Sequence, residues 1–181
     1  MPEAKHITSP TTYASRGDFS RIFHEELDSL YLLSLLLTAD REIAEHCFVS
    51  GLEDSVNGNL VFKEWARSWA RRVVIQSAVD VIKPRPMEEI APSNSNSRDT
   101  TAPVGLPEIA TVLTLRPFER FVYTMSVLEH YSDQDCSVLL GCARWHVIAA
   151  RIRALQQIGS AMDFILSGGC VSPAKPGLHD K

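Results

Sequence analysis

Apolar residues recur at helical spacing in a first block of the chain, which begins near residue 18. Phe23, Leu27 and Leu30 lie three or four positions apart, and this period is typical of one face of a helix. Asp18 or Ser20 can cap the start of this helix, because their side-chain oxygens accept bonds from free backbone N–H groups. The pattern therefore predicts a helix that opens the first block.

Two further helices complete the first block. Asp40 can cap the second helix. Its apolar side comprises Ile43, Ala44, Cys47 and Phe48. The adjacent Asn57 and Gly58 indicate a turn. The third helix is expected over residues 60–82, and it ends before Pro84 because proline lacks the N–H and clashes with the preceding turn.

Residues 84–104 are rich in Pro, Ser, Asn and Thr and hold few large apolar residues, so we expect a flexible linker there. A second helical block follows, in which Pro107 and Pro117 suit the first positions of helices. Its clearest apolar stripe comprises Phe118, Phe121, Val122, Met125 and Leu128. No segment alternates as a strand does. The sequence therefore predicts an all-α fold with two small helical domains, at 18–83 and 105–166.

Residues 132–155 have the pattern of two helices joined at a turn. Ser132 can cap the first helix, and Gly141 can adopt the left-handed backbone that the turn needs. In the second helix, we expect an apolar stripe to face inward: Trp145, Ile148, Ile152 and Leu155. The basic residues beside or opposite it are Arg144, His146, Arg151 and Arg153. This predicts a helix-turn-helix, which places its second helix in a DNA groove. A plain helical hairpin with solvated arginines is the alternative.

The overall charge restricts how such a protein could bind nucleic acid. The chain has 181 residues, a net charge of −4 and a pI of about 5.8. A general electrostatic attraction to nucleic acid is therefore not expected, and any contact must come from a local basic patch.

The cysteines do not form a metal-binding or disulfide pattern. They are Cys47, Cys136, Cys142 and Cys170, with no C-x-x-C pair among them, and we expect free buried thiols. Cys142 and His146 are four residues apart and could share a metal ion, but a site needs three or four ligands. We therefore expect no metal and no cofactor.

The carboxylates near residue 40 admit two interpretations. Asp40, Glu42 and Glu45 lie at a predicted helix start, where acidic groups stabilise the helix by capping and by their interaction with its dipole. A small helical enzyme that uses them for acid–base chemistry is the alternative. Since no nucleophile–base pair or phosphate-binding loop accompanies them, we expect a protein that is not an enzyme.

Two tryptophans share a face of the third helix. Trp65 and Trp69 are four residues apart, which suits core packing or, alternatively, stacking against unpaired bases. Arg71 and Arg72 add positive charge to the same helix.

The order of these parts resembles the small, two-domain sigma factors of bacterial RNA polymerase, of the extracytoplasmic-function (ECF) type. LYLLSLLLTADREIAEHCF (30–48) and FKEWARSWARR (62–72) are similar to two motifs of the domain that binds the polymerase core and melts the promoter. LRPFERFVYTMSVLEHYSDQDCSVLLGC (115–142) is similar to the domain that reads the −35 promoter element. The resemblance covers both predicted domains and the linker.

The resemblance implies a role for each candidate site. Polymerase core would bind Asp40, Arg41, Glu42 and Glu45. The melted −10 element would lie near Trp65, Trp69, Arg71 and Arg72. The −35 element would face Arg144, His146, Arg151 and Arg153. The implied partners are RNA polymerase core, promoter DNA and an anti-sigma factor. A sigma-like interaction module that binds polymerase or a regulator without promoter-specific initiation is the alternative function.

The recognition helix can be aligned with the family in two registers. Without a gap, Val147 matches an inward valine and Arg151 replaces an inward leucine. Shifted by one residue, Ile148 and Ile152 take the inward positions. The shifted register agrees with the apolar stripe, so we expect Ile148 and Ile152 to be buried and Arg153 to be exposed.

The chain shows no feature of a membrane or secreted protein. The N-terminus lacks the apolar core of a leader peptide. The apolar run at 30–37 is shorter than the roughly 20 residues that span a bilayer. We therefore expect a cytoplasmic protein without membrane insertion.

Overall fold

The structure is a computed structural model, which describes residues 12–58, 60–86 and 107–166. Within these ranges the chain is all-α, as the sequence predicts, and its only extended pairing is an isolated bridge between Tyr13 and Phe62. The α-helices are α1 (Arg16–Glu25), α2 (Leu27–Thr38), α3 (Arg41–Asn57), α4 (Ala66–Ile82), α5 (Pro107–Leu113), α6 (Pro117–Tyr123), α7 (Asp133–Leu139) and α8 (Arg144–Leu166). A 3-10 turn, η1 (Lys63–Trp65), precedes α4, and a π-helical turn, η2 (Thr124–Leu128), follows α6.

The first helix begins earlier than expected and is followed by a break. Ser15 caps α1, in place of Asp18 or Ser20. The Ser15 hydroxyl accepts the backbone N–H of Asp18 at 3.2 Å, and the Asp18 carboxylate accepts the N–H of Ser15 at 2.9 Å. Asp18 is thus the third helical residue of a capping box rather than the cap. Glu26, with φ −105° and ψ 20°, separates α1 from α2.

Most other predicted boundaries are confirmed. Asp40 caps α3, which ends at Asn57. Helix α4 ends at Ile82, as the following prolines require. Pro117 is the first residue of α6, and Ser132 caps α7. Local signals thus position the helix ends correctly in both halves of the chain.

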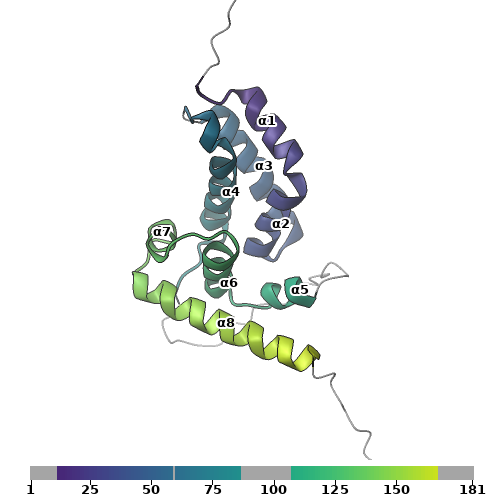
Figure 1. Cartoon of the computed structure of the whole chain (residues 1–181), viewed down its shortest axis with the longest axis vertical. Helices are drawn as coiled ribbons and strands as arrows, with labels where there is room; N and C mark the ends of the chain where they lie inside the picture. Colours follow the sequence, from purple (N-terminus) through teal and green to yellow (C-terminus); the bar gives the residue numbers. More distant parts are fainter. Residues whose placement is uncertain (1–11, 59, 87–106, 167–181) are drawn as a thin grey trace, which may run out of the picture.

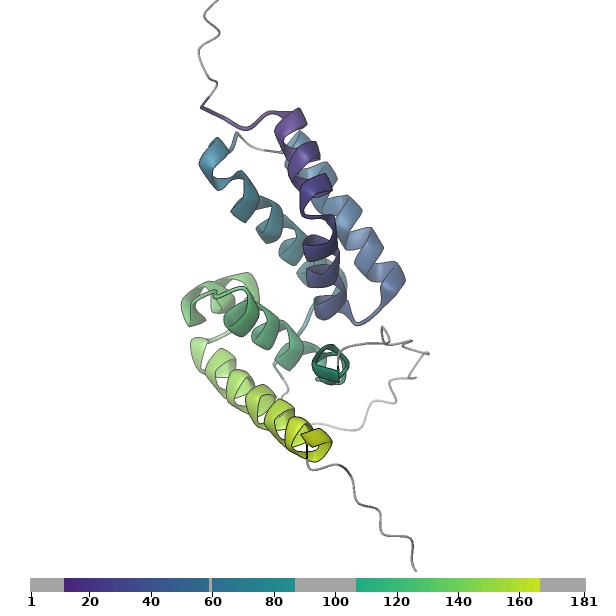
Figure 2. The same ribbon diagram turned by 45° about the vertical axis from the view of Figure 1, so that its right-hand side comes forward.

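The two helical blocks pack against each other through a shared hydrophobic core. The first block contributes buried residues that include Phe19, Leu30, Leu37 and Val74, and the second contributes Phe118, Phe121, Met125 and Val147. In both views, α6 lies between the α1–α4 bundle and α8 (Figures 1 and 2). The division into domains at 18–83 and 105–166 stays a prediction, and most of the expected linker lies outside the described residues.

A buried arginine joins the two blocks. The Arg120 guanidinium of α6 donates hydrogen bonds to the carbonyls of Leu37 and Thr38, both at 3.1 Å, and to that of Leu115 at 3.0 Å. Leu37 and Thr38 end α2, where helix carbonyls lack partners within the helix. Burial lowers the pKa of Arg120 to about 10, so the side chain stays charged at neutral pH. It therefore caps α2 from the other block.

Candidate functional site

The turn between α7 and α8 is closed by backbone hydrogen bonds. The Gly141 N–H donates to the carbonyl of Val138 at 3.3 Å, and the Cys142 N–H donates to that of Ser137 at 3.0 Å. These two bonds form a Schellman motif, which ends a helix with a left-handed residue. Gly141 has the required φ of +60°, so the predicted turn is confirmed.

Helix α8 presents small residues to the core. Val147, Ala150 and Ala154 are fully buried, and Val147 and Ala150 pack in the core shared with α6. Small side chains suit this position because they let two helices approach closely. The inward face is therefore the one that includes Val147.

The expected inward stripe lies largely on the surface, so the expectation that Ile152 is buried is wrong. Trp145 is 65% exposed, Ile152 is 50% exposed and Leu155 is 47% exposed. Ile148 is partly buried. The large apolar side chains predict this stripe as the inward face, whereas the core contains the smaller residues of the adjacent face.

Two arginines predicted to face DNA form ion pairs within the protein. Arg151 of α8 is paired with Asp133, in the first turn of α7. The Nε of Arg153 donates to the buried carboxylate of Glu119 at 2.7 Å. Arg153 is exposed as expected, but its charge is partly neutralised by this contact.

The other two predicted groups near the −35 surface differ from each other. Arg144 is exposed and forms no ion pair within the described part of the chain. His146 is partly buried, and its Nδ1 is buried without a hydrogen-bond partner. The four residues thus comprise one free cation, two paired arginines and one histidine that faces inward.

The residues predicted to lie near the −10 element also differ from one another in exposure and in contacts. Trp65 is 59% exposed and packs edge-on against Phe62 at 5.2 Å between ring centroids. Trp69 is partly buried beside the core, and its Nε1 has no partner. Arg72 is half-buried. Trp65, in the turn η1 before α4, is therefore the tryptophan of this pair that is available to a ligand.

Arg71 contacts both blocks. Its guanidinium donates to the Glu129 carboxylate at 2.8 Å and to the Glu26 carboxylate at 3.3 Å. It also donates to the Ser29 hydroxyl at 2.8 Å. Since Glu129 follows η2 in the second block, this side chain links the blocks and is not free.

The residues assigned to polymerase binding form a charged surface at the start of α3. Asp40 accepts the N–H of Ile43 at 3.0 Å and so has a structural role as the cap. Arg41, Glu42 and Glu45 are exposed and form no ion pair within the described ranges. This surface differs from the arginine sites because its charges are unpaired.

The cysteines have the character expected of buried thiols where the structure describes them. Cys47 and Cys136 are buried, and Cys142 is partly buried. Burial raises the pKa of the Cys136 thiol to about 12 and also raises the pKa of Cys142. These thiols are therefore protonated at neutral pH. No group of three His, Cys, Asp or Glu residues that could hold a metal was found in the described regions, and Cys170 lies outside them.

The buried charges of α6 are not among the residues predicted from the sequence. Glu119 and Arg120 lie inside the apolar stripe that starts at Phe118, and both are buried. Burial raises the pKa of Glu119, but hydrogen bonds from Arg116 and Arg153 outweigh it, and the pKa is lowered. The signal in the sequence that could have predicted their burial is the position of two charged residues within an apolar run.

No family model and no curated protein matches this sequence. Among the described residues, none of the helices has the length and apolar character to cross a membrane.

Proposed function

We propose that this protein is a sigma-factor-like transcription protein, which binds RNA polymerase core through the start of α3 and promoter DNA through α8. It acts by binding rather than by catalysis. The observation that carries this proposal is the unpaired charged surface of Arg41, Glu42 and Glu45. These residues belong to the motif that resembles the polymerase-binding helix of sigma factors, and they need not break an internal contact to bind a partner.

The cap at Asp40 supports this assignment. Its hydrogen bond to the Ile43 N–H fixes the first turn of α3, and the adjacent end of α2 is held by Arg120. The exposed charges therefore project from a rigid corner, which reduces the entropy lost on binding.

Contacts to DNA require a rearrangement. Arg144 is the free cation at the start of α8, and Trp65 is exposed for stacking against an unpaired base. Arg71, Arg151 and Arg153 must exchange carboxylate partners for phosphates or bases. We therefore expect promoter DNA to bind weakly until polymerase core has bound.

The polymerase contact can be tested with charge reversal on one helix. We expect Glu42→Arg combined with Glu45→Arg to weaken core binding at least tenfold, which corresponds to about 1.4 kcal/mol. Glu53→Arg combined with Asp54→Arg is the matched control, because both residues are exposed at the other end of α3. Fluorescence anisotropy of labelled full-length protein measures both affinities. Equal affinities of the two double variants would contradict the proposal.

A second candidate function is an interaction module that occupies polymerase or a regulator, such as an anti-sigma factor, without initiating transcription. The exposed apolar residues Trp145, Ile152 and Leu155 favour it, because such side chains suit protein partners better than phosphates. Run-off transcription with core polymerase separates the two functions. Promoter-specific transcripts that disappear in an Arg144→Ala, Arg153→Ala variant support initiation, whereas core binding without any transcript supports the interaction module.

A further inference from the structure

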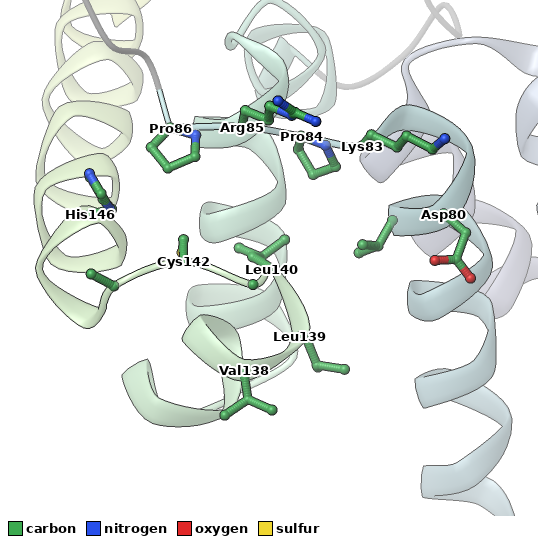
Figure 3. Close-up of a pocket in the computed structure, with 13 residues that line it drawn as sticks. Asp80, Lys83, Pro84, Arg85, Pro86, Val138, Leu139, Leu140, Cys142 and His146 are labelled. Carbon is green, nitrogen blue, oxygen red and sulfur yellow. The ribbon is translucent and has the colours of Figure 1, made fainter.

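A cavity lies where the end of α4 faces the turn between α7 and α8. Its volume is about 730 Å³, within the range of small-molecule sites. One wall is the segment from Lys83 to Pro86, and the opposite wall is the turn from Val138 to Ala143. Figure 3 shows the two walls facing each other, with His146 of α8 at one end and Asp80 of α4 at the other. The cavity is therefore built from both blocks.

The walls combine apolar surface with unpaired positive charge. Pro84, Pro86 and Leu140 supply apolar surface. Lys83 and Arg85 form no ion pair within the described regions, unlike Arg71, Arg151 and Arg153. Asp80 is the one acidic side chain in the lining, and it lies at the far end from His146 (Figure 3).

His146, at one end of the cavity (Figure 3), has an unsatisfied polar atom. The Nδ1 of His146 is buried and has no hydrogen-bond partner, although buried polar groups are almost always paired. Because this atom is closed to a molecule the size of water, a ligand in the cavity can contact only the rest of the ring. The cation-bearing wall and the apolar surfaces are two independent features of a ligand site.

We propose that this cavity binds a small organic anion, with an oxyanion group near Arg85 and Lys83 and an apolar body between the prolines and Leu140. The His146 ring packs against the ligand at one end of the cavity. Asp80 excludes molecules with a second anionic group at the other end. Because the ligand contacts both walls, it stabilises the packing of the two blocks. The proposal does not depend on the transcriptional role.

Titration of the full-length protein with three related probes tests the charge requirement. Phenyl phosphate, benzoate and benzyl alcohol share an aromatic ring and differ in charge. The NMR signals of the His146 ring report occupancy. We expect both anions to shift these signals and raise Tm, and benzyl alcohol to do neither. A stronger effect of phenyl phosphate than of benzoate identifies a phosphate site, and the reverse identifies a carboxylate site.

Variants locate the site. We expect Arg85→Gln to weaken binding of the preferred anion at least tenfold, and Asp80→Asn to leave it equal or make it tighter. Arg144→Gln is the matched control, because Arg144 is an exposed cation outside the cavity lining, and it should change the affinity less than twofold. Absence of binding by both anions, equal binding of benzyl alcohol, or an unchanged affinity in Arg85→Gln would overturn the proposal.

Discussion

Replacing Arg120 with methionine should strongly destabilise the folded protein. The substitution keeps a long side chain of similar volume but removes all donors to the carbonyls of Leu37, Thr38 and Leu115. Two of these carbonyls end α2, and no other described group donates to them. The variant therefore tests whether a residue of the second block is required to donate hydrogen bonds to the carbonyls of the first block.

The size of the effect follows from two opposing contributions. A buried carbonyl that loses its donor costs about 1–3 kcal/mol, so three of them give roughly 3–9 kcal/mol. Removing the charge offsets part of this cost, because lowering the pKa from 12.5 to about 10 corresponds to roughly 3 kcal/mol of desolvation. We expect a net loss of about 3 kcal/mol in the free energy of unfolding.

Urea unfolding at neutral pH, followed by circular dichroism, measures this loss. Arg120→Lys should lie between wild type and Arg120→Met, because an ammonium group keeps the charge but not the planar fork of donors. Arg21→Met is the control, since the Arg21 side chain is 65% exposed and should change stability by less than about 0.5 kcal/mol. A free energy of unfolding for Arg120→Met within about 1 kcal/mol of wild type would show that Arg120 is not required to cap α2.

Two further predictions concern helix packing and pH. Gly51→Ala should destabilise the protein by about 1–3 kcal/mol, because a Cβ there would meet Val74 Cγ2 at 2.9 Å. A Cβ at Gly159 would meet open space, so Gly159→Ala should stabilise α8 by about 0.5–1 kcal/mol. Thermal unfolding measures both variants. If both glycine substitutions changed the stability in the same direction, the close contact between Gly51 and Val74 would be contradicted. The pKa of Glu119 is lower in the folded protein than the ordinary value of 4.5, so the ionised carboxylate stabilises the fold. This contribution is fully present above pH 4.5 and is lost as the pH falls through the pKa of the folded protein. The unfolding midpoint should therefore decrease less on acidification in Glu119→Gln than in wild type, when it is measured above and below pH 4.5. Parallel pH profiles of the two proteins would show that ionised Glu119 does not stabilise the fold.

The helices could be predicted from sequence because their signals are local. The caps at Asp40 and Ser132 and the left-handed turn at Gly141 each depend on a few neighbouring residues. The cap at Ser15 was missed because Asp18 is also a good cap, and only the reciprocal bond between the two shows which residue lies outside the helix.

The candidate site was harder to predict because it depends on contacts between distant segments. Arg71 and Glu129 are 58 residues apart in sequence, and the sequence alone does not show that their charges meet. The same holds for Arg153 and Glu119. Basic residues thus identify where a nucleic acid could bind, but not whether their charge is already neutralised.

The orientation of α8 shows why large apolar residues were a poor guide to its buried face. The helix is held by ion pairs on either side of its small inward residues, from Arg151 to Asp133 and from Arg153 to Glu119. Rotating it to bury Trp145 and Ile152 would separate both pairs and force large side chains into the space that Ala150 now fills. Close packing against α6 and two satisfied charges therefore outweigh the burial of a larger apolar stripe, and they leave that stripe exposed on the surface.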